Sequence, residues 1–207
     1  MFAGKVNYKQ NNKMKFQHIE LDKTLSPFVK SILVFESQET TIQTSLPFFA
    51  DGFPGLMYHQ TPNGLTVNPR KKQMPQLFVY GQTIEPIEME IYGSYQIIVF
   101  QLFPFTLKSL FSIEPKSIND NCYDLSQENI QVQHNLLEAL SLSAGLGSRI
   151  SLLTAYIEKM IETKRMNFDQ AVSSAIKKII AANGKCSLTE TAKEVHLTKR
   201  TFERRFL

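Results

Sequence analysis

The first two thirds of the chain alternate between short apolar runs, rich in Ile, Val, Phe and Tyr, and segments with Pro, Gly and Asn. β-Branched and aromatic residues favour strands, whereas Gly, Pro and Asn favour turns. The last apolar run is almost wholly apolar, so we expect it deep in the core. Turns are expected at 62–64 and 92–94. The pattern predicts six strands, at 15–20, 31–37, 55–60, 76–80, 87–92 and 95–103, which is typical of a β barrel or sandwich.

After Pro104 the apolar spacing becomes helical. A short helix is expected around 105–111, followed by helices at 126–142 and 148–163 with a break at 143–147. The second long helix carries one apolar stripe, formed by Leu152, Leu153, Tyr156, Ile157, Met160 and Ile161. The sequence leaves two interpretations of the helices open: they complete the core of the β domain, or they form the seam of a dimer.

The C-terminal forty residues begin with a third amphipathic helix. Asn167 is placed to cap its start, and Asn183-Gly184 to end it, since both residue types tolerate a positive φ. Its apolar face repeats at i, i+3, i+4 and i+7, through Phe168, Ala171, Val172, Ala175, Ile176, Ile179 and Ile180.

Two shorter helices follow. Ser187 and Glu190 have the spacing of a capping box, in which each side chain binds the other residue's backbone amide. We expect this helix to turn its apolar residues inward, namely Leu188, Ala192 and Val195. His196 is then suited to a tight turn with positive φ.

Thr198 is placed to cap the last helix, with Leu197 and Phe202 spaced as a hydrophobic staple. Phe202 and Phe206 would face the core. The opposite side carries polar and basic residues, Lys199, Arg200, Glu203 and Arg204. Helix, tight turn and basic helix together predict a helix-turn-helix that fits the DNA major groove; the alternative is a small helical bundle with no role in DNA binding.

The positive charge is confined to this segment. Residues 168–207 contain eight Lys/Arg and four Asp/Glu, whereas the rest of the chain contains 15 of each sign, so all of the net charge of +4 lies in the last forty residues. A local basic excess favours a polyanionic partner such as DNA; an ordinary solvated helix face remains the alternative.

Residues 187–206, S-L-T-E-T-A-K-E-V-H-L-T-K-R-T-F-E-R-R-F, resemble the first helix-turn-helix of the AraC/XylS family of bacterial transcription regulators. The resemblance rests on Leu188, Ala192, Val195, His196, Leu197, Thr198, Arg200, Thr201, Phe202, Glu203, Arg204 and Phe206. It implies that the last helix is a recognition helix with Arg200, Glu203 and Arg204 facing bases. Lys199, Arg205, Ser187 and Thr198 would contact phosphate. Glu203 either accepts from a cytosine amine or pairs with Arg200 or Arg204.

The N-terminal part is similar to a sensor domain found in a subset of that family, over residues 21–125. The motifs that carry the likeness are L-P-F-F-A-D-G-F-P-G-L-M-Y at 46–58, V-Y-G-Q-T at 79–83 and F-P-F at 103–105. The resemblance implies an α+β chain: a cupin-like β barrel with appended helices, then a homeodomain-like helical segment. The family's DNA-binding unit contains two helix-turn-helix motifs, so the chain is expected to be truncated after the first.

Other chemistry is weakly represented. Tyr58, His59, Tyr80 and Gln82 are candidates to line a ligand pocket in the barrel. Asp51-Gly52 and Pro54-Gly55 have the character of turn residues rather than catalysts. The four histidines show no paired spacing, so no metal site and no cofactor are expected. Cys122 and Cys186 match no metal or redox motif and are expected to be reduced thiols.

The expected organisation is therefore a β-rich sensor or dimerisation domain at 1–125, linking or dimerising helices at 126–166, and a DNA-binding segment at 167–207. The expected function is a ligand-responsive, DNA-binding transcription regulator that is not an enzyme. Its partners are promoter DNA, an unknown small-molecule effector and a second copy of the chain. No signal peptide or apolar span is present, which favours the cytoplasm and no membrane partner. The alternatives are a dimerising or sensing protein that does not bind DNA, and a cupin-like metal enzyme.

Overall fold

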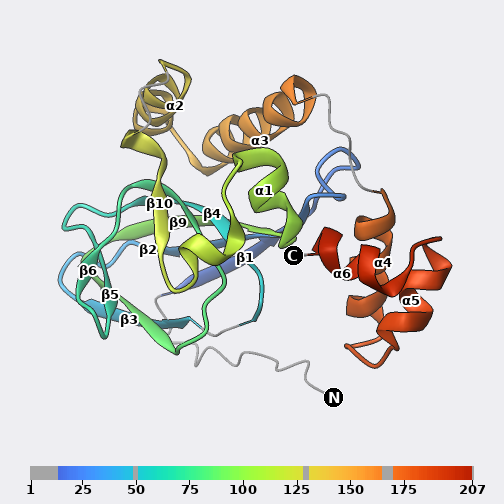
Figure 1. Ribbon diagram of the computed structural model, residues 1–207. Coiled ribbons are helices and arrows are strands. Elements are labelled where there is room, and N and C mark those ends of the chain that lie inside the picture. Colours follow the sequence, from blue (N-terminus) through green and yellow to red (C-terminus); the bar gives the residue numbers. More distant parts are fainter. Residues whose placement is uncertain (1–13, 49–50, 128–130, 165–169, 207) are drawn as a thin grey trace. The chain divides into compact units, whose positions relative to one another are not determined.

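The computed structural model describes residues 14–48, 51–127, 131–164 and 170–206. Its contacts divide the described chain into two units, one with residues 14–164 and one with residues 170–206. We call the first the β unit and the second the helical unit, and we describe each separately (Figure 1).

In its described part the β unit has ten strands, and all of their pairings are antiparallel. The larger sheet has the order β1-β2-β9-β4-β7-β10 and the smaller sheet the order β3-β8-β5-β6. The strands are β1 Lys15–Ile19, β2 Val29–Ser37, β3 Gln43–Phe48, β4 Gly55–Gln60, β5 Leu65–Asn68, β6 Lys72–Gln73, β7 Leu77–Tyr80, β8 Ile87–Tyr92, β9 Tyr95–Leu102 and β10 Cys122–Asp124.

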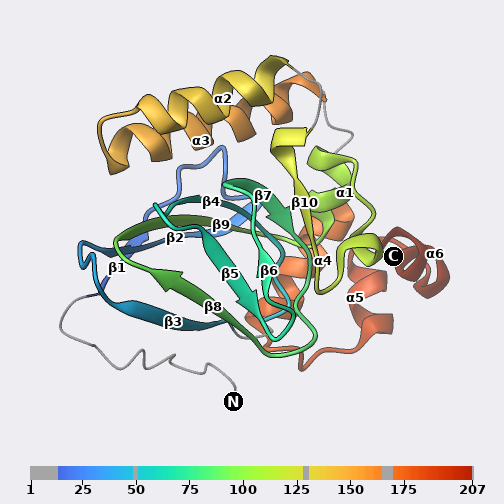
Figure 2. The ribbon, with the colours of Figure 1, turned by 90° about the vertical axis from the view of Figure 1, so that its left-hand side faces the viewer.

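The larger sheet of the β unit lies between the smaller sheet and a layer of helices (Figure 2), and buried side chains fill the space on both of its faces. On one face, Met57 and Phe78 of this sheet pack toward Met89 of the smaller sheet. The strand β9 is the most deeply buried, as its apolar sequence predicts, with six consecutive buried residues from Ile97 to Leu102.

Helices cover the other face of the larger sheet. They are α1 Phe105–Phe111, α2 Gln131–Leu142 and α3 Leu146–Thr163, with short 3-10 turns at Pro115–Ile118 and Leu125–Gln127. Figure 2 shows α2 and α3 lying side by side above the strands. Leu153, Tyr156 and Ile157 of α3 are buried, so much of the predicted apolar stripe faces the β unit's own core.

Arg149 fixes this helical layer. Its guanidinium is buried and donates to the Leu140 carbonyl at 3.2 Å and the Ser143 carbonyl at 2.9 Å, at the end of α2. It also donates to the side-chain oxygen of Gln96 on β9 at 2.6 Å. A cation there opposes the negative end of the α2 dipole while it ties the helix to the sheet.

Each of the six predicted strands coincides with an observed one, and the turns at Gly64 and Gly93 have the positive φ that their sequences require. The closed barrel is a correction, because no ladder joins the two sheets within the described residues. Closure needs the edge strands of one sheet to pair with those of the other. Here the edges β1 and β10, and β3 and β6, each pair on one side only.

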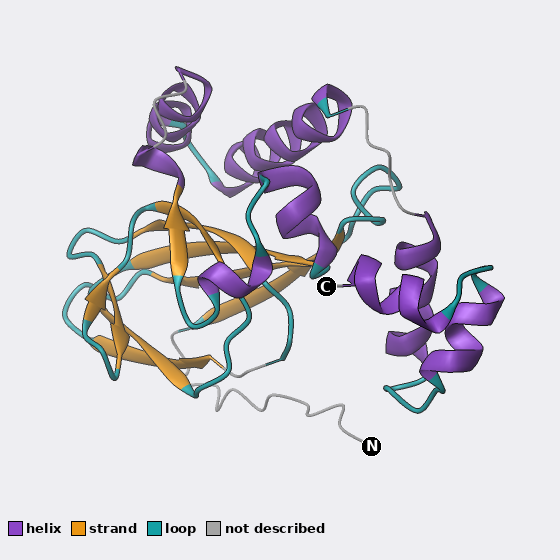
Figure 3. Ribbon diagram, in the orientation of Figure 1, coloured by secondary structure: helices purple, strands orange, loops and turns teal. Residues whose placement is uncertain are grey.

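The helical unit consists, in its described part, of α4 Gln170–Ala181, α5 Leu188–Glu194 and α6 Lys199–Phe206 (Figure 3). Asn183 and Gly184 have φ of 50° and 74° and end α4 as predicted, with the Gly184 amide donating to the Ile179 carbonyl at 2.8 Å. The expected cap Asn167 and the apolar Phe168 lie outside the described residues.

Candidate functional site

The helical unit is built around one aromatic side chain. Phe202 of α6 is 1% exposed and packs with Ala175 of α4 and Ala192 of α5, while Val195 and Leu197 close the cluster from the α5–α6 turn. Small residues at 175 and 192 let the three helices approach the ring closely. This core determines which side of α6 faces outward.

Local hydrogen bonds begin α5 and α6 and form the turn between them. Ser187 accepts from the Glu190 amide at 3.4 Å, and Thr198 accepts from the Thr201 amide at 3.2 Å, so both predicted caps are confirmed. His196 has φ of 56° and its amide donates to the Lys193 carbonyl, which makes the tight turn that the sequence predicts. The reciprocal half of the capping box, from Glu190 to the Ser187 amide, does not occur among the described hydrogen bonds.

The prediction that Leu188 packs inward is wrong. Its side chain is 48% exposed, and Thr191 is buried in its place. The buried Thr191 hydroxyl has a hydrogen-bond partner, because it donates to the Ser187 carbonyl one turn earlier at 2.9 Å. The buried face of α5 therefore runs through 191, 192 and 195, and the first helical residue lies beyond the edge of the cluster.

The outward side of α6 is polar. Lys199, Arg200 and Glu203 are all exposed, as expected for residues opposite Phe202. Glu203 lies 3.8 Å from the ammonium of Lys199, one helical turn away. Within the described part of the chain no ion pair engages Arg200. The side chains of Arg204, Arg205 and Phe206 lie outside the described residues, so their predicted roles stay predictions.

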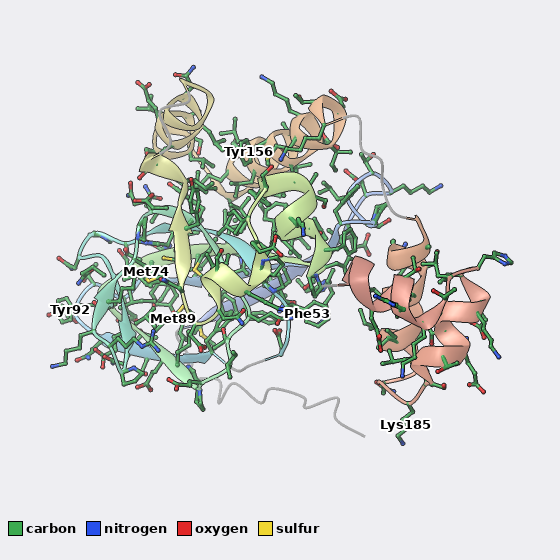
Figure 4. All side chains as sticks on the ribbon, in the orientation of Figure 1. Phe53, Met74, Met89, Tyr92, Tyr156 and Lys185 are labelled. Atoms are coloured by element: carbon green, nitrogen blue, oxygen red, sulfur yellow. The ribbon has the colours of Figure 1, made fainter. Side chains whose placement is uncertain are left out.

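A cavity of about 70 Å³ lies between the two sheets of the β unit. Its apolar wall comes from both sheets and is rich in methionine and aromatic side chains. Figure 4 labels two of these methionines, Met74 and Met89, among the strands. The apolar lining consists of Phe48, Met57, Val67, Met74, Phe78, Tyr80, Ile87 and Met89.

The mouth of the cavity is polar and is made from two loops. One is the β5–β6 turn, where Lys71 has φ of 49° and Arg70 and Lys72 flank it. The other is residues 120–122, held to the end of β7 because the Gly81 amide donates to the Asn121 carbonyl at 3.1 Å. The loops meet where the Lys72 ammonium donates to the Asn121 side-chain oxygen at 2.5 Å and lies 3.4 Å from the Cys122 sulfur.

Two carboxylates at the mouth are already engaged. Asp120 accepts from the backbone amides of Ile84 at 2.6 Å and Glu85 at 3.2 Å, and these bonds lower the pKa of its carboxyl group. Glu85 lies 3.9 Å from Arg70. Both acids are thus directed to the loop backbone and to Arg70 rather than to Lys72.

Among the four predicted ligand residues, Tyr80 lines the cavity. It is 7% exposed, and its hydroxyl has no hydrogen-bond partner in the described part of the chain. Burial, together with the nearby Asp51 charge, raises the pKa of this phenol well above its usual value. Its ring lies over Gly55, where an added Cβ would come within 2.4 Å of the hydroxyl. Gly55 is therefore required for this tyrosine position.

The other three candidates do not line the cavity. Tyr58 faces the helical layer, where burial raises the pKa of its phenol and the charge of Arg149 opposes that effect. His59 is buried against Thr61, 2.9 Å from its Nδ1, and burial lowers the pKa of its imidazole. Gln82 donates to the Gly52 carbonyl at 3.0 Å and so braces a loop.

Gly52 and Asp51 behave as predicted for a turn: Gly52 has φ of 78°, and Asp51 accepts from the Phe53 amide at 2.9 Å. Within the ranges that the structure describes, no three His, Cys, Asp or Glu side chains gather where they could bind a metal. None of the described helices has both the length and the apolarity to cross a bilayer. Cys122 and Cys186 are free thiols.

Sequence reasoning did not identify Arg70, Lys72, Asp120 and Cys122 as site residues. Lys72 and Cys122 are fifty positions apart, and each looks like an ordinary loop or edge residue. The methionines carried a weak signal, because Met is common where a surface must adapt to a ligand.

Comparison with known proteins gives one family match and one structural likeness. No curated protein matches the chain. A solved structure titled "Crystal structure of the AraC-like transcriptional activator CuxR" is 10% identical, covers 93% of this chain and 79% of that one, and has a TM-score of 0.37. So low a TM-score does not establish a shared fold. The family model described as "Domain of unknown function (DUF6597)" matches residues 17–124, just over half of the chain. The chain belongs to this family.

Proposed function

We propose that the protein is a transcription regulator that binds DNA through α6 of the helical unit and responds to a small molecule through the β unit. The observation that carries the proposal is the exposed face of α6, with Lys199, Arg200 and Glu203 opposite the buried Phe202. A capped helix that presents basic side chains after a tight turn fits the major groove. The likeness of residues 187–206 to an AraC/XylS helix-turn-helix supports the same assignment.

Charge gives independent support. The helical segment holds all of the chain's positive excess, and DNA affinity depends on the number of phosphates that Lys and Arg neutralise. In this proposal Arg200 and Arg204 contact DNA bases, and Lys199 and Arg205 contact DNA phosphates. Ser187 and Thr198 lie beside the DNA backbone. Since Glu203 lies beside Lys199 in the structure, we assign it to positioning that lysine.

The cavity between the two sheets is the proposed effector site. The domain that contains it is proposed to be cupin-like. A ligand there changes DNA affinity only if it binds the two regulatory arrangements unequally. The proposal retains a homodimer in the cytoplasm as its working form.

The test is DNA binding by the 207-residue chain, measured by fluorescence anisotropy on a pool of random 30-bp duplexes at several salt concentrations. We expect binding that weakens steeply as salt rises. Arg200→Ala should lose about 1–3 kcal/mol of binding free energy on a selected sequence, with relaxed preference at one base pair. Lys23→Gln, an exposed lysine of the β unit, is the matched control.

Dimerisation without salt-dependent DNA binding would reject the proposal in favour of a sensing or dimerising protein. An equal loss on all sequences for Arg200→Ala would reassign that residue from base to phosphate contact.

A further inference from the structure

The cavity mouth holds a cation whose charge is not balanced by an acid. Among the described residues the Lys72 ammonium contacts two neutral groups, the Asn121 side-chain oxygen at 2.5 Å and the Cys122 sulfur at 3.4 Å. The carboxylates nearby are committed elsewhere, Asp120 to two backbone amides and Glu85 to Arg70. Within the described residues Lys72 therefore has no carboxylate partner, and it stands where a ligand would enter.

Behind Lys72 the wall between the two sheets is mainly apolar, and Tyr80 is part of it. The hydroxyl of Tyr80, in a residue 93% buried, has no partner among the described groups. Burial of a hydroxyl that makes no hydrogen bond destabilises the folded protein. A molecule that fills the cavity would change the surroundings of this hydroxyl. The cavity thus combines an apolar body with a mouth where Lys72, unlike Arg70, has no carboxylate partner among the described residues.

Size limits the ligand. At about 70 Å³ the space is about half of the 150 Å³ apolar cavity that binds benzene. Met57, Met74 and Met89 line it, and their unbranched side chains can move aside at low cost. The cavity therefore suits a short apolar chain or one small ring.

We propose that this cavity binds a small apolar monocarboxylate, with its hydrocarbon body between the sheets and its carboxylate on Lys72. The inference names the effector class of the proposed regulator and rests on that function for its regulatory meaning. The binding itself is a property of the β unit and is measured without DNA.

Cys122 makes the test specific to this site, because its sulfur lies at the mouth. The full chain is treated with iodoacetamide in the presence of butyrate, hexanoate, acetate or hexanamide. Alkylation of Cys122 is followed by mass spectrometry, with Cys186 of the helical unit as the internal reference. Hexanoate should slow alkylation of Cys122 but not of Cys186. Acetate, which lacks the body, and hexanamide, which lacks the charge, should protect at least tenfold more weakly.

Two further quantities test the geometry. Each added methylene from butyrate to hexanoate should tighten binding about fourfold while the cavity still has room.

Lys72→Gln should weaken the binding of hexanoate by about tenfold or more, since a charge-assisted contact is lost. Because Lys72 touches the Cys122 sulfur, each variant is judged by the ratio of its own rates with and without hexanoate. Lys23→Gln is the matched control, and Met89→Phe, which fills the cavity, should abolish protection.

Equal protection by hexanamide, full protection in Lys72→Gln, or no protection by any acid would each overturn the inference. If Met89→Phe fails to fold, Lys72→Gln still decides, because Lys72 is exposed. Loss of hexanoate binding leaves the DNA measurements untouched, and an absence of DNA binding leaves the cavity measurements untouched, so failure of one claim is distinguishable from failure of the other.

Discussion

Removal of the Phe202 ring should unfold the helical unit while the β unit stays folded. Phe202 is 1% exposed, and among the described residues it is the one large side chain in a cluster whose other fully buried members are Ala175 and Ala192. Substitution of a buried Phe by Ala costs about 3–5 kcal/mol, from lost transfer free energy and the cavity left behind.

The consequence follows from the size of the unit. Its described part has 37 residues, and domains gain about 0.05–0.15 kcal/mol per residue, so its whole stability is about 2–6 kcal/mol. The loss in Phe202→Ala is as large as that total. The β unit has a separate core that contains β9, so its stability should change little.

The assay is amide hydrogen exchange of the native chain and Phe202→Ala, compared between residues 188–206 and residues 95–102. We expect protection to disappear in the first segment and persist in the second. Leu188→Ala is the matched control: its side chain is 48% exposed on the same unit, so protection should remain. Persistent protection of 188–206 in Phe202→Ala would refute the role given to this ring, and unfolding by Leu188→Ala would restore the sequence-based view that Leu188 is core.

Two further predictions concern the β unit. Arg149→Met should cost about 2–4 kcal/mol, because two carbonyls at the end of α2 and the Gln96 amide lose charged donors; urea unfolding measures the loss, and a change below about 0.5 kcal/mol would contradict this bracing role. Burial lowers the pKa of His59 below its usual 6.5; as pH falls below 6.5 the unfolded chain therefore binds the proton first, and stability falls by at most about 1.4 kcal/mol per pH unit. Urea unfolding at pH 7.5 and 5.5 should show a smaller loss in His59→Asn than in the native chain, and equal losses would remove His59 as the cause.

The helical unit shows what a single sequence can predict. Its caps at Ser187 and Thr198, the α4 stop at Asn183-Gly184 and the turn at His196 each depend on residues within five positions of one another. Such local signals survive in the fold because no distant partner is needed to make them. The prediction that Leu188 is buried was wrong for the opposite reason, because the side of α5 that is buried depends on where α4 and α6 pack.

Strand prediction also succeeded where the signal is local and failed where it depends on distant partners. Long apolar runs such as β9 were evident, whereas β5, β6 and β10 have two to four residues each and exist only because a partner strand lies beside them. The sequence also could not decide between a barrel and two sheets, because closure depends on edge pairing and not on apolar periodicity.

The pairing register between β4 and β7 alone decides which of the tyrosine candidates, Tyr58 or Tyr80, faces the cavity. Tyr58 and Tyr80 lie on adjacent strands, and both are aromatic, buried and polar at the tip. In the β4–β7 ladder Gly55 lies opposite Tyr80 and Tyr58 lies opposite Leu77. Opposed residues share a face and neighbours alternate, so Tyr80 faces the cavity and Tyr58 faces the helices. A shift of one residue would exchange them. No tight turn joins β4 to β7 that could fix the register from sequence; the missing Cβ of Gly55, which gives the Tyr80 ring its place, marks the register that the folded chain adopts.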